Sequence, residues 1–258
     1  MKNIIGTENS DLIEGTNESE SIRALGGSDT IIAGGGDDWI TPGTGNDSVD
    51  GGDGSDVLFY EGVYDGVAVN NTASLKDGLP AYSTLSSDGL GQDTFAGIEH
   101  FHLSNGGDVF YTDASGYVFM RSGNDTAYVT DASVRVIPGS GSDNIIADVV
   151  RPSSLVYSDG GYDNFGIADP TINSGIQVSY DSRNPSSLSG QVIDGWGDTD
   201  TFSGINRIEG TDLTDTMSAE GTMLSIRFEG LDGNDTLTGG GGDDRLYGGD
   251  GNDTLTGG

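Results

Sequence analysis

Large aliphatic residues recur every nine positions in the first part of the chain, and this pattern predicts the fold. They stand at Ile13, Ile22, Ile31, Ile40, Val49 and Leu58. Each is the middle of three residues expected to point outward, inward and outward, which is the period of a short β-strand. The residues between these triplets become rich in glycine and other turn formers. The pattern therefore predicts a repeat of one short strand and one turn.

One strand and one turn cover half of a coil, so two repeats, or about 18 residues, should close one full coil. Successive coils then stack as parallel strands about 4.8 Å apart. The aliphatic residues from both sides of the coil meet in a thin core. We expect an all-β fold, a parallel β-roll or β-helix solenoid that is partly irregular in the middle of the chain.

An acidic residue precedes each of these aliphatic residues by two positions. The set is Asp11, Glu20, Asp29, Asp38, Asp47 and Asp56. Repeats two apart lie on the same side of the coil, so their carboxylates form columns that repel each other in a partly dry turn. Calcium would remove this repulsion, because it accepts about six to eight oxygen ligands in irregular cages and glycine-rich turns expose carbonyl oxygens.

The composition supports a cation-dependent fold. The 258 residues include 42 acidic and 10 basic side chains, a formal net charge of −32, 45 glycines and only 33% hydrophobic residues. Such a chain should stay expanded unless cations neutralise it, and the regular aliphatic residues favour that possibility over disorder. Phosphate repulsion argues against nucleic acid as a partner. There is no cysteine for a disulfide or thiolate site, and no apolar run approaches the roughly 18 residues that span a bilayer.

Three segments resemble the nonapeptide repeats of the RTX (repeats-in-toxin) family. They are GGDGSDVLF (51–59), GGGGDDRLY (239–247) and GGDGNDTLT (248–256). The resemblance implies a right-handed parallel β-roll with calcium bound between adjacent turns. It also implies a bacterial protein secreted by the type I route. The chain enters its first repeat without an apolar export signal, so we expect an extracellular protein whose secretion signal lies outside this chain.

We expect several calcium ions to be shared by acids two repeats apart, together with backbone carbonyls of the glycine-rich turns. The pairs are Asp29 with Asp47, Asp38 with Asp56, Asp235 with Asp253, and Asp11 with Asp29. Asp244 has no partner two repeats later and should form half a site. Thr7 and Thr16 replace the second glycine of the first two repeats, which should therefore form a weak or empty cap.

The middle of the chain contains an internal duplication. The segment 93–98, Asp-Thr-Phe-Ala-Gly-Ile, recurs at 200–205 as Asp-Thr-Phe-Ser-Gly-Ile, an offset of 107. We expect the two units, 56–108 and 163–215, to continue the roll with looser turns. Between them, acid-poor repeats keep their inward residues, and aromatics at the predicted inward positions Phe110, Phe119 and Phe165 predict a wider core.

One elongated solenoid with five parts is predicted. These are an N-terminal RTX roll (1–58), an irregular unit (59–107), degenerate repeats (108–165), a second irregular unit (166–214) and a C-terminal RTX roll (215–258).

His100 and His102 are the only histidines, and both should face the same side of a strand. A zinc pair is therefore sterically possible. The internal copy has Arg207 and Glu209 at these positions, which a shared metal role would not predict, so we interpret them as surface histidines.

No catalytic residues are predicted. The chain lacks the H-E-x-x-H zinc motif and the G-x-S-x-G nucleophile elbow, and the period of the acids is explained by metal ligation alone. We expect a non-enzymatic calcium-binding module that folds on binding calcium and forms a structural or secretion-promoting part of an extracellular protein. The alternatives are a carbohydrate-active module of epimerase or lyase type and an adhesin segment. Extracellular polysaccharide or a cell surface would then be the partner.

Overall fold

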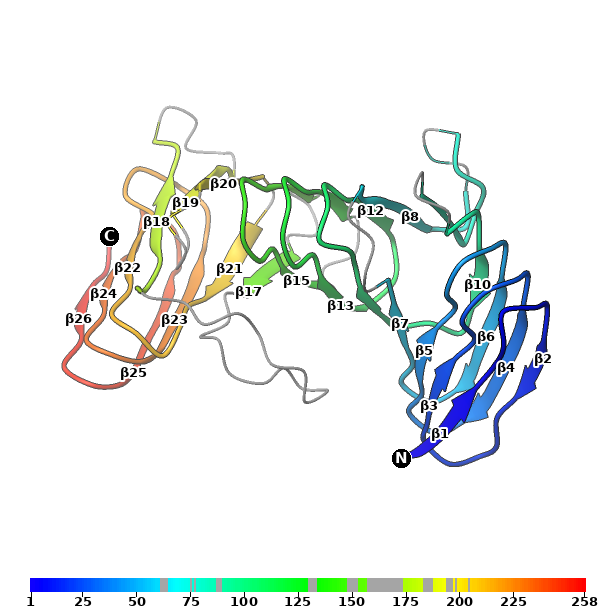
Figure 1. Cartoon of the computed structure of the whole chain (residues 1–258). Coiled ribbons are helices and arrows are strands. Elements are labelled where there is room, and N and C mark those ends of the chain that lie inside the picture. The colour runs from blue at the N-terminus through cyan, green and yellow to red at the C-terminus, as the bar shows by residue number, and fades with distance from the viewer. Residues whose placement is uncertain are drawn as a thin grey trace. The chain divides into compact units, whose positions relative to one another are not determined.

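The computed structural model describes residues 1–60, 65–74, 76, 78–86, 90–129, 134–147, 153–156, 174–182, 188–193, 197, 199–203 and 205–258. These residues form two compact units, Met1–Asp125 and Thr126–Gly258, and both are built from β-strands (Figure 1). In this described part of the chain, no helix is long and apolar enough to cross a membrane.

The first unit winds its strands alternately into two sheets. The strands are β1 (Lys2–Ile5), β2 (Leu12–Glu14), β3 (Glu20–Arg23), β4 (Thr30–Gly35), β5 (Trp39–Thr41), β6 (Ser48–Asp53), β7 (Val57–Phe59), β8 (Val67–Asn71), β9 (Ser83–Ser86), β10 (Thr94–Ala96), β11 (His100–His102), β12 (Val109–Thr112) and β13 (Gly116–Phe119). Their order is β1-β3-β5-β7-β11-β13 in one sheet and β2-β4-β6-β10-β9-β8-β12 in the other.

Parallel partners in the first unit follow the predicted coil length. Thr30 is in register with both Leu12 and Ser48, and Trp39 with both Ser21 and Val57. Each of these partners lies 18 residues from the next. The predicted all-β parallel solenoid is therefore confirmed.

The core of this unit is the predicted column of aliphatic side chains. Ile22, Ile31 and Ile40 are fully buried, and the register stacks Ile22 against Ile40. The next residue after Ile31, Ile32, points outward and is 42% exposed. Burying a side chain of this size contributes about 1.5–3 kcal/mol, so the column supplies the main apolar stabilisation of each coil.

Antiparallel strands interrupt the first unit, and the hydrophobic pattern did not predict them. β9 pairs antiparallel with both β8 and β10. β10 nevertheless pairs parallel with β6, and β12 pairs parallel with β8. Thr94 thus lies in register with Ser48, although the two residues belong to distant parts of the sequence. The strands β8 and β9 are an insertion, after which the coil resumes.

The second unit has the same construction. Its strands are β14 (Thr126–Val129), β15 (Val134–Ile137), β16 (Asn144–Ala147), β17 (Ser153–Val156), β18 (Gln177–Tyr180), β19 (Gly190–Ile193), β20 (Thr199–Ser203), β21 (Ile205–Glu209), β22 (Thr216–Ser218), β23 (Arg227–Asp232), β24 (Thr236–Thr238), β25 (Arg245–Asp250) and β26 (Thr254–Thr256). The orders are β15-β17-β21-β23-β25 and β14-β16-β20-β19-β18-β22-β24-β26. Figure 1 shows the last of these strands, in red, stacked coil upon coil.

The internal duplication of the sequence is also a duplication of structure. β19 pairs antiparallel with β18 and β20, while β18 pairs parallel with β22. The bounds of β9, Ser83–Ser86, coincide with those of β19, Gly190–Ile193, at the offset of 107 residues. Both copies therefore carry the same antiparallel insertion.

The prediction of an inward Phe119 was wrong. Val118 is in register with the core residue Phe101, and Phe119 is in register with His102 on the opposite face of the sheet. The degenerate repeats have unequal lengths, and a shift of one residue moves a side chain to the other face of a strand. Phe110 does lie in the core. Phe165 and its repeat at 163–165 lie outside the described residues.

Candidate calcium sites in the turns

The acids of the repeats connect neighbouring coils through one carboxylate oxygen. Asp47 Oδ1 accepts a hydrogen bond from the backbone N–H of Asp29 at 2.8 Å, and Asp56 Oδ1 accepts one from Asp38 at 2.9 Å. In the same way, Asp29 Oδ1 accepts a hydrogen bond from the backbone N–H of Asp11. Asp253 Oδ1 accepts one from the backbone N–H of Asp235. The structure therefore places the two members of every predicted pair in adjacent coils.

The second carboxylate oxygen of these acids distinguishes the turns. Among the acids of the predicted pairs, all of which the structure describes, five Oδ2 atoms are buried and accept no hydrogen bond. They belong to Asp29, Asp38, Asp47, Asp56 and Asp235. A buried polar atom without a partner costs about 1–3 kcal/mol, more when it is charged, so these oxygens require a positively charged partner.

Backbone carbonyl oxygens lie beside these acids. Gly54 has a φ of 147°, and a Cβ at this position would overlap the carbonyl oxygen of Gly36 one coil earlier. Gly45 has a φ of 129° and the same relation to Gly27. Only glycine allows such a close approach in this left-handed conformation. A Cβ at Gly51 would overlap both Asp56 Oδ2 and the Gly97 carbonyl oxygen, and a Cβ at Gly230 would overlap both Asp235 Oδ2 and the Gly248 carbonyl oxygen, so uncharged oxygen atoms lie close to these two carboxylates.

Burial makes the acids difficult to ionise without a counter-charge. It raises the pKa of Asp56 to about 7 and that of Asp47 to about 6, and the neighbouring carboxylates of Asp38 and Asp29 add to these shifts. Hydrogen bonds from the backbone lower both pKa values in part. Burial also raises the pKa of Asp38 and Asp235. A bound cation would favour the ionised form of each.

The donor set suits calcium. Carboxylate and carbonyl oxygens are the ligands of a hard cation, and calcium tolerates irregular arrangements of them. Among the described residues, no three His, Asp or Glu side chains gather around one point. A cation held here would therefore complete its coordination with backbone carbonyl oxygens.

Two predicted ligands differ from the others. Asp11 Oδ2 accepts hydrogen bonds from the Thr7 N–H at 2.6 Å and from Thr7 Oγ1 at 2.8 Å. Asp244 Oδ2 accepts one from the Gly240 N–H at 2.7 Å. Both acids lie in stacked turns. In each of them the chain already supplies a hydrogen-bond donor to Oδ2, the atom that has no donor in the five acids named above.

The interpretation of the two histidines as surface residues was wrong, since both are buried. His100 Nε2 lies 2.8 Å from Ser55 Oγ, and His100 Nδ1 accepts a hydrogen bond from the Tyr117 N–H at 3.0 Å. His102 stacks between Phe59 and Phe119, with ring centroids 4.6 and 4.2 Å away. Aromatic side chains from neighbouring coils cover this face. Both nitrogens of His100 are engaged, which disfavours the zinc pair.

Asp93 has the same structural role as the repeat acids, although the glycine-rich pattern did not identify it. Its Oδ1 accepts a hydrogen bond from the Asp47 N–H at 2.9 Å, across the inserted strands. Its Oδ2 accepts one from the Tyr60 hydroxyl at 3.0 Å. The available signal was the spacing of the Asp-Thr-Phe motif, in which the inward Phe95 follows the acid by two positions.

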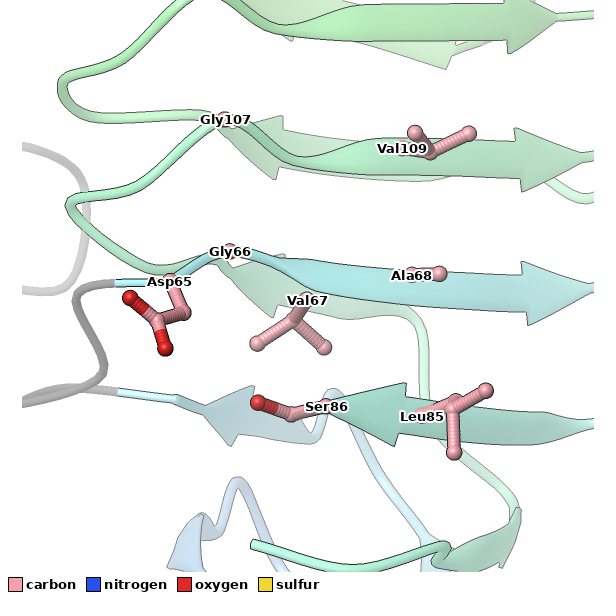
Figure 2. A pocket seen from close by; sticks show the side chains of 8 residues that line it. All are labelled: Asp65, Gly66, Val67, Ala68, Leu85, Ser86, Gly107 and Val109. Carbon is pink, nitrogen blue, oxygen red and sulfur yellow. The ribbon is translucent and has the colours of Figure 1, made fainter. Parts of the chain in front are cut away.

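A shallow pocket of about 400 Å³ lies beside the first insertion (Figure 2). The register places Ala68 between Leu85 and Val109 on three adjacent strands. Among the described residues that line it, Asp65 is the one ionisable side chain.

Comparison with known proteins agrees with the geometry of the turns. The family model for the RTX calcium-binding nonapeptide repeat matches in four copies, at residues 5–40, 14–49, 39–66 and 229–258. No curated protein matches the chain. Among solved structures, the extracellular lipase LipA from Serratia marcescens is 16% identical with a TM-score of 0.25, and the match covers 80% of this chain and 38% of the lipase. The chain therefore carries RTX calcium-binding nonapeptide repeats in both of its compact units, and calcium is the ligand that these repeats imply.

Proposed function

We propose that this protein is a calcium-dependent structural module whose coils are locked together by calcium bound between stacked turns. The supporting observation is the set of buried Asp Oδ2 atoms that accept no hydrogen bond, all in turns rich in carbonyl oxygens. Asp29, Asp47, Asp38 and Asp56 would hold calcium in the first unit, and Asp235 with Asp253 in the second. When bound, calcium supplies the positive charge that balances these carboxylates.

Calcium binding should be coupled to folding. The stacked turns exist only in the folded chain, so a cation that binds them hardly binds the open chain. Each site then stabilises the folded state by about 2.7 kcal/mol when calcium exceeds its Kd a hundredfold. Extracellular calcium modules have Kd values on the order of 0.1–1 mM.

This coupling supports an extracellular role. With a formal net charge of −32, the chain repels itself where calcium is scarce, as in the bacterial cytosol. It would leave the cell unfolded by the type I route, which the family resemblance implies, and fold where calcium is abundant. In a longer parent protein, the module would promote secretion and provide a rigid support for other domains.

Circular dichroism and thermal unfolding, with calcium titrated against EGTA, test this function. We expect calcium to increase the β-signal and to raise the unfolding midpoint, and magnesium at the same concentration to raise it much less. The double variant Asp38→Asn with Asp56→Asn should show a smaller rise in midpoint when calcium is added. A spectrum and midpoint that are unchanged by chelation would refute the proposal.

A further inference from the structure

The residue four positions before each acid divides the turns into two classes. This residue occupies the second position of a six-residue turn that ends with the acid. In the five turns of the predicted pairs whose acid has a buried oxygen without a hydrogen-bond partner, its φ is positive. The residues are Leu25 (78°), Gly34 (109°), Gly43 (98°), Gly52 (96°) and Leu231 (76°). We call these open turns.

In the second class, a hydroxyl residue occupies that position and binds the acid. Thr211 Oγ1 donates to Asp215 Oδ1 at 3.0 Å, and the Thr211 N–H donates to Oδ2 at 2.8 Å. Ser104 makes the same two bonds to Asp108, at 2.5 and 2.9 Å. We call these capped turns.

The first coil has two more capped turns. Thr16 Oγ1 donates to Glu20 Oε1 at 2.5 Å, and the Thr16 N–H donates to Oε2 at 3.1 Å. Thr7 donates both its hydroxyl and its N–H to Asp11 Oδ2. Neither threonine has a positive φ.

The conformation of the second residue explains the two classes. With a negative φ, its N–H points at the acid and its hydroxyl reaches the same carboxylate. In the left-handed conformation no hydrogen bond runs from this N–H to the acid, and an oxygen is left without a donor. Threonine is β-branched and avoids the left-handed region, which glycine enters freely. Threonine at this position therefore favours a capped turn, whereas glycine can adopt either conformation: Gly240 has no positive φ and donates its N–H to Asp244.

We propose that the capped turns take no calcium, because Thr7, Thr16, Ser104 and Thr211 supply to the acid the donors that calcium supplies in open turns. This inference rests on the proposed function, since it divides the repeat acids into those that need the ion and those that do not. A cation entering a capped turn would first have to displace two hydrogen bonds to the acid, one from a hydroxyl and one from a backbone N–H. Capped turns should therefore hold their coils together without calcium, and open turns should not.

The positions of the capped turns agree with this role. Ser104 and Thr211 are equivalent at the 107-residue offset of the internal duplication, and each follows an inserted antiparallel segment. Asp108 Oδ1 also accepts a bond from the Val67 N–H at 2.6 Å, and Asp215 Oδ1 accepts one from the Ile176 N–H at 2.7 Å. Asp108 and Asp215 thus each tie a coil to an inserted segment through three donors of the chain.

Converting an open turn into a capped turn tests the inference. Leu231 is 37% exposed, so Leu231→Thr removes little from the core and introduces the hydroxyl four positions before Asp235. Leu231→Gly is the matched control, because glycine retains the left-handed conformation. Calcium stoichiometry is measured by equilibrium dialysis of the full chain, with circular dichroism in saturating calcium as the folding check.

We expect Leu231→Thr to bind one calcium ion fewer than the wild type and Leu231→Gly to bind the same number. Equal stoichiometry in the two folded variants would overturn the inference while leaving the proposed function intact. A wild type that binds no calcium would overturn the proposed function, and with it the inference.

The reverse test removes a cap. Thr211→Val keeps the β-branched shape but lacks the hydroxyl, and Thr211→Ser keeps the hydroxyl. In EGTA, hydrogen exchange at the Ile176 and Asp215 amides should accelerate about tenfold or more in Thr211→Val and remain at the wild-type rate in Thr211→Ser. Identical exchange in the two variants would show that the hydroxyl does not hold the turn, and would overturn the inference.

Discussion

Asp56→Asn should stabilise the protein without calcium and destabilise it with calcium. In the wild type, Asp56 Oδ1 accepts a hydrogen bond from the Asp38 N–H, and Oδ2 is buried without a donor. The asparagine oxygen can keep the first bond. The amide nitrogen replaces the second oxygen and removes its negative charge. The substitution therefore separates two effects of the acid: the destabilisation from its buried negative charge, and the stabilisation that it gives as a calcium ligand.

The magnitude follows from the pKa of this carboxyl. Burial raises the pKa of Asp56 to about 7, against about 3.9 in an unfolded chain. A raised folded-state pKa gives stability that is present below the unfolded value and is lost as the pH rises through the folded value. At pH 8, the full shift would correspond to an upper limit on the order of 4 kcal/mol. Solvent around this half-buried group reduces the expected gain to about 1–2 kcal/mol.

Urea denaturation at pH 8, followed by circular dichroism, measures both effects. In EGTA, Asp56→Asn should raise the free energy of unfolding by about 1–2 kcal/mol. In saturating calcium, it should lower it by about 1–3 kcal/mol, because one charged ligand is lost. Asp53→Asn makes the same charge change at an exposed residue of the same turn and should shift stability by less than about 0.5 kcal/mol in either condition. Equal destabilisation by Asp56→Asn in EGTA and in calcium would refute the reasoning.

Three further outcomes are expected. Burial raises the pKa of Asp47 to about 6 and that of Asp56 to about 7, so calcium affinity should fall about tenfold from pH 8 to pH 6 and calcium binding should release protons. Calorimetry in buffers of different ionisation enthalpy measures this proton release, and binding without it would contradict the prediction. Ile31→Ala should cost about 2–5 kcal/mol in chemical denaturation and Ile32→Ala much less, because Ile31 is buried and Ile32 is exposed. Glu229 lies 2.7 Å from Arg207 Nε and 2.6 Å from Arg227 Nε, so Glu229→Gln should lower stability by about 1 kcal/mol at low salt, whereas the exposed control Glu220→Gln should not.

The regular parts of the fold were predictable because each coil repeats the same local chemistry. A buried aliphatic two positions after an acid specifies both a strand and its face, so Ile31 and Asp29 were sufficient to predict the coil and its stacking. The acid pairs followed from the same period. The hydrogen bond from the Asp29 N–H to Asp47 did not follow, because its geometry depends on how two coils fit together.

The irregular parts were not predictable from the period. β9 pairs antiparallel with neighbours on both sides, and such long-range pairing depends on loops that carry no repeat. The burial of His102 between Phe59 and Phe119 needs two other coils in the correct register. The capped turns, by contrast, left a local signal: a threonine or serine four positions before an acid. At Thr7 and Thr16 the same signal also reads as a missing glycine of the repeat.

Capping beside the two insertions has a physical cause. In an open turn, the neighbouring coil offers another acid and a glycine-rich turn, so carbonyl oxygens from two coils surround the carboxylate. Asp108 and Asp215 have an acid on one side only, Asp125 and Asp235 respectively. On the other side the neighbouring positions are Val67 and Ile176, which belong to the inserted segments and bring no acid. A cation on the inserted side would lack the second carboxylate, while a carboxylate left alone would be buried without a partner. A hydroxyl four residues earlier resolves both difficulties within one turn, and this explains why the duplication retains a hydroxyl residue at the two equivalent positions.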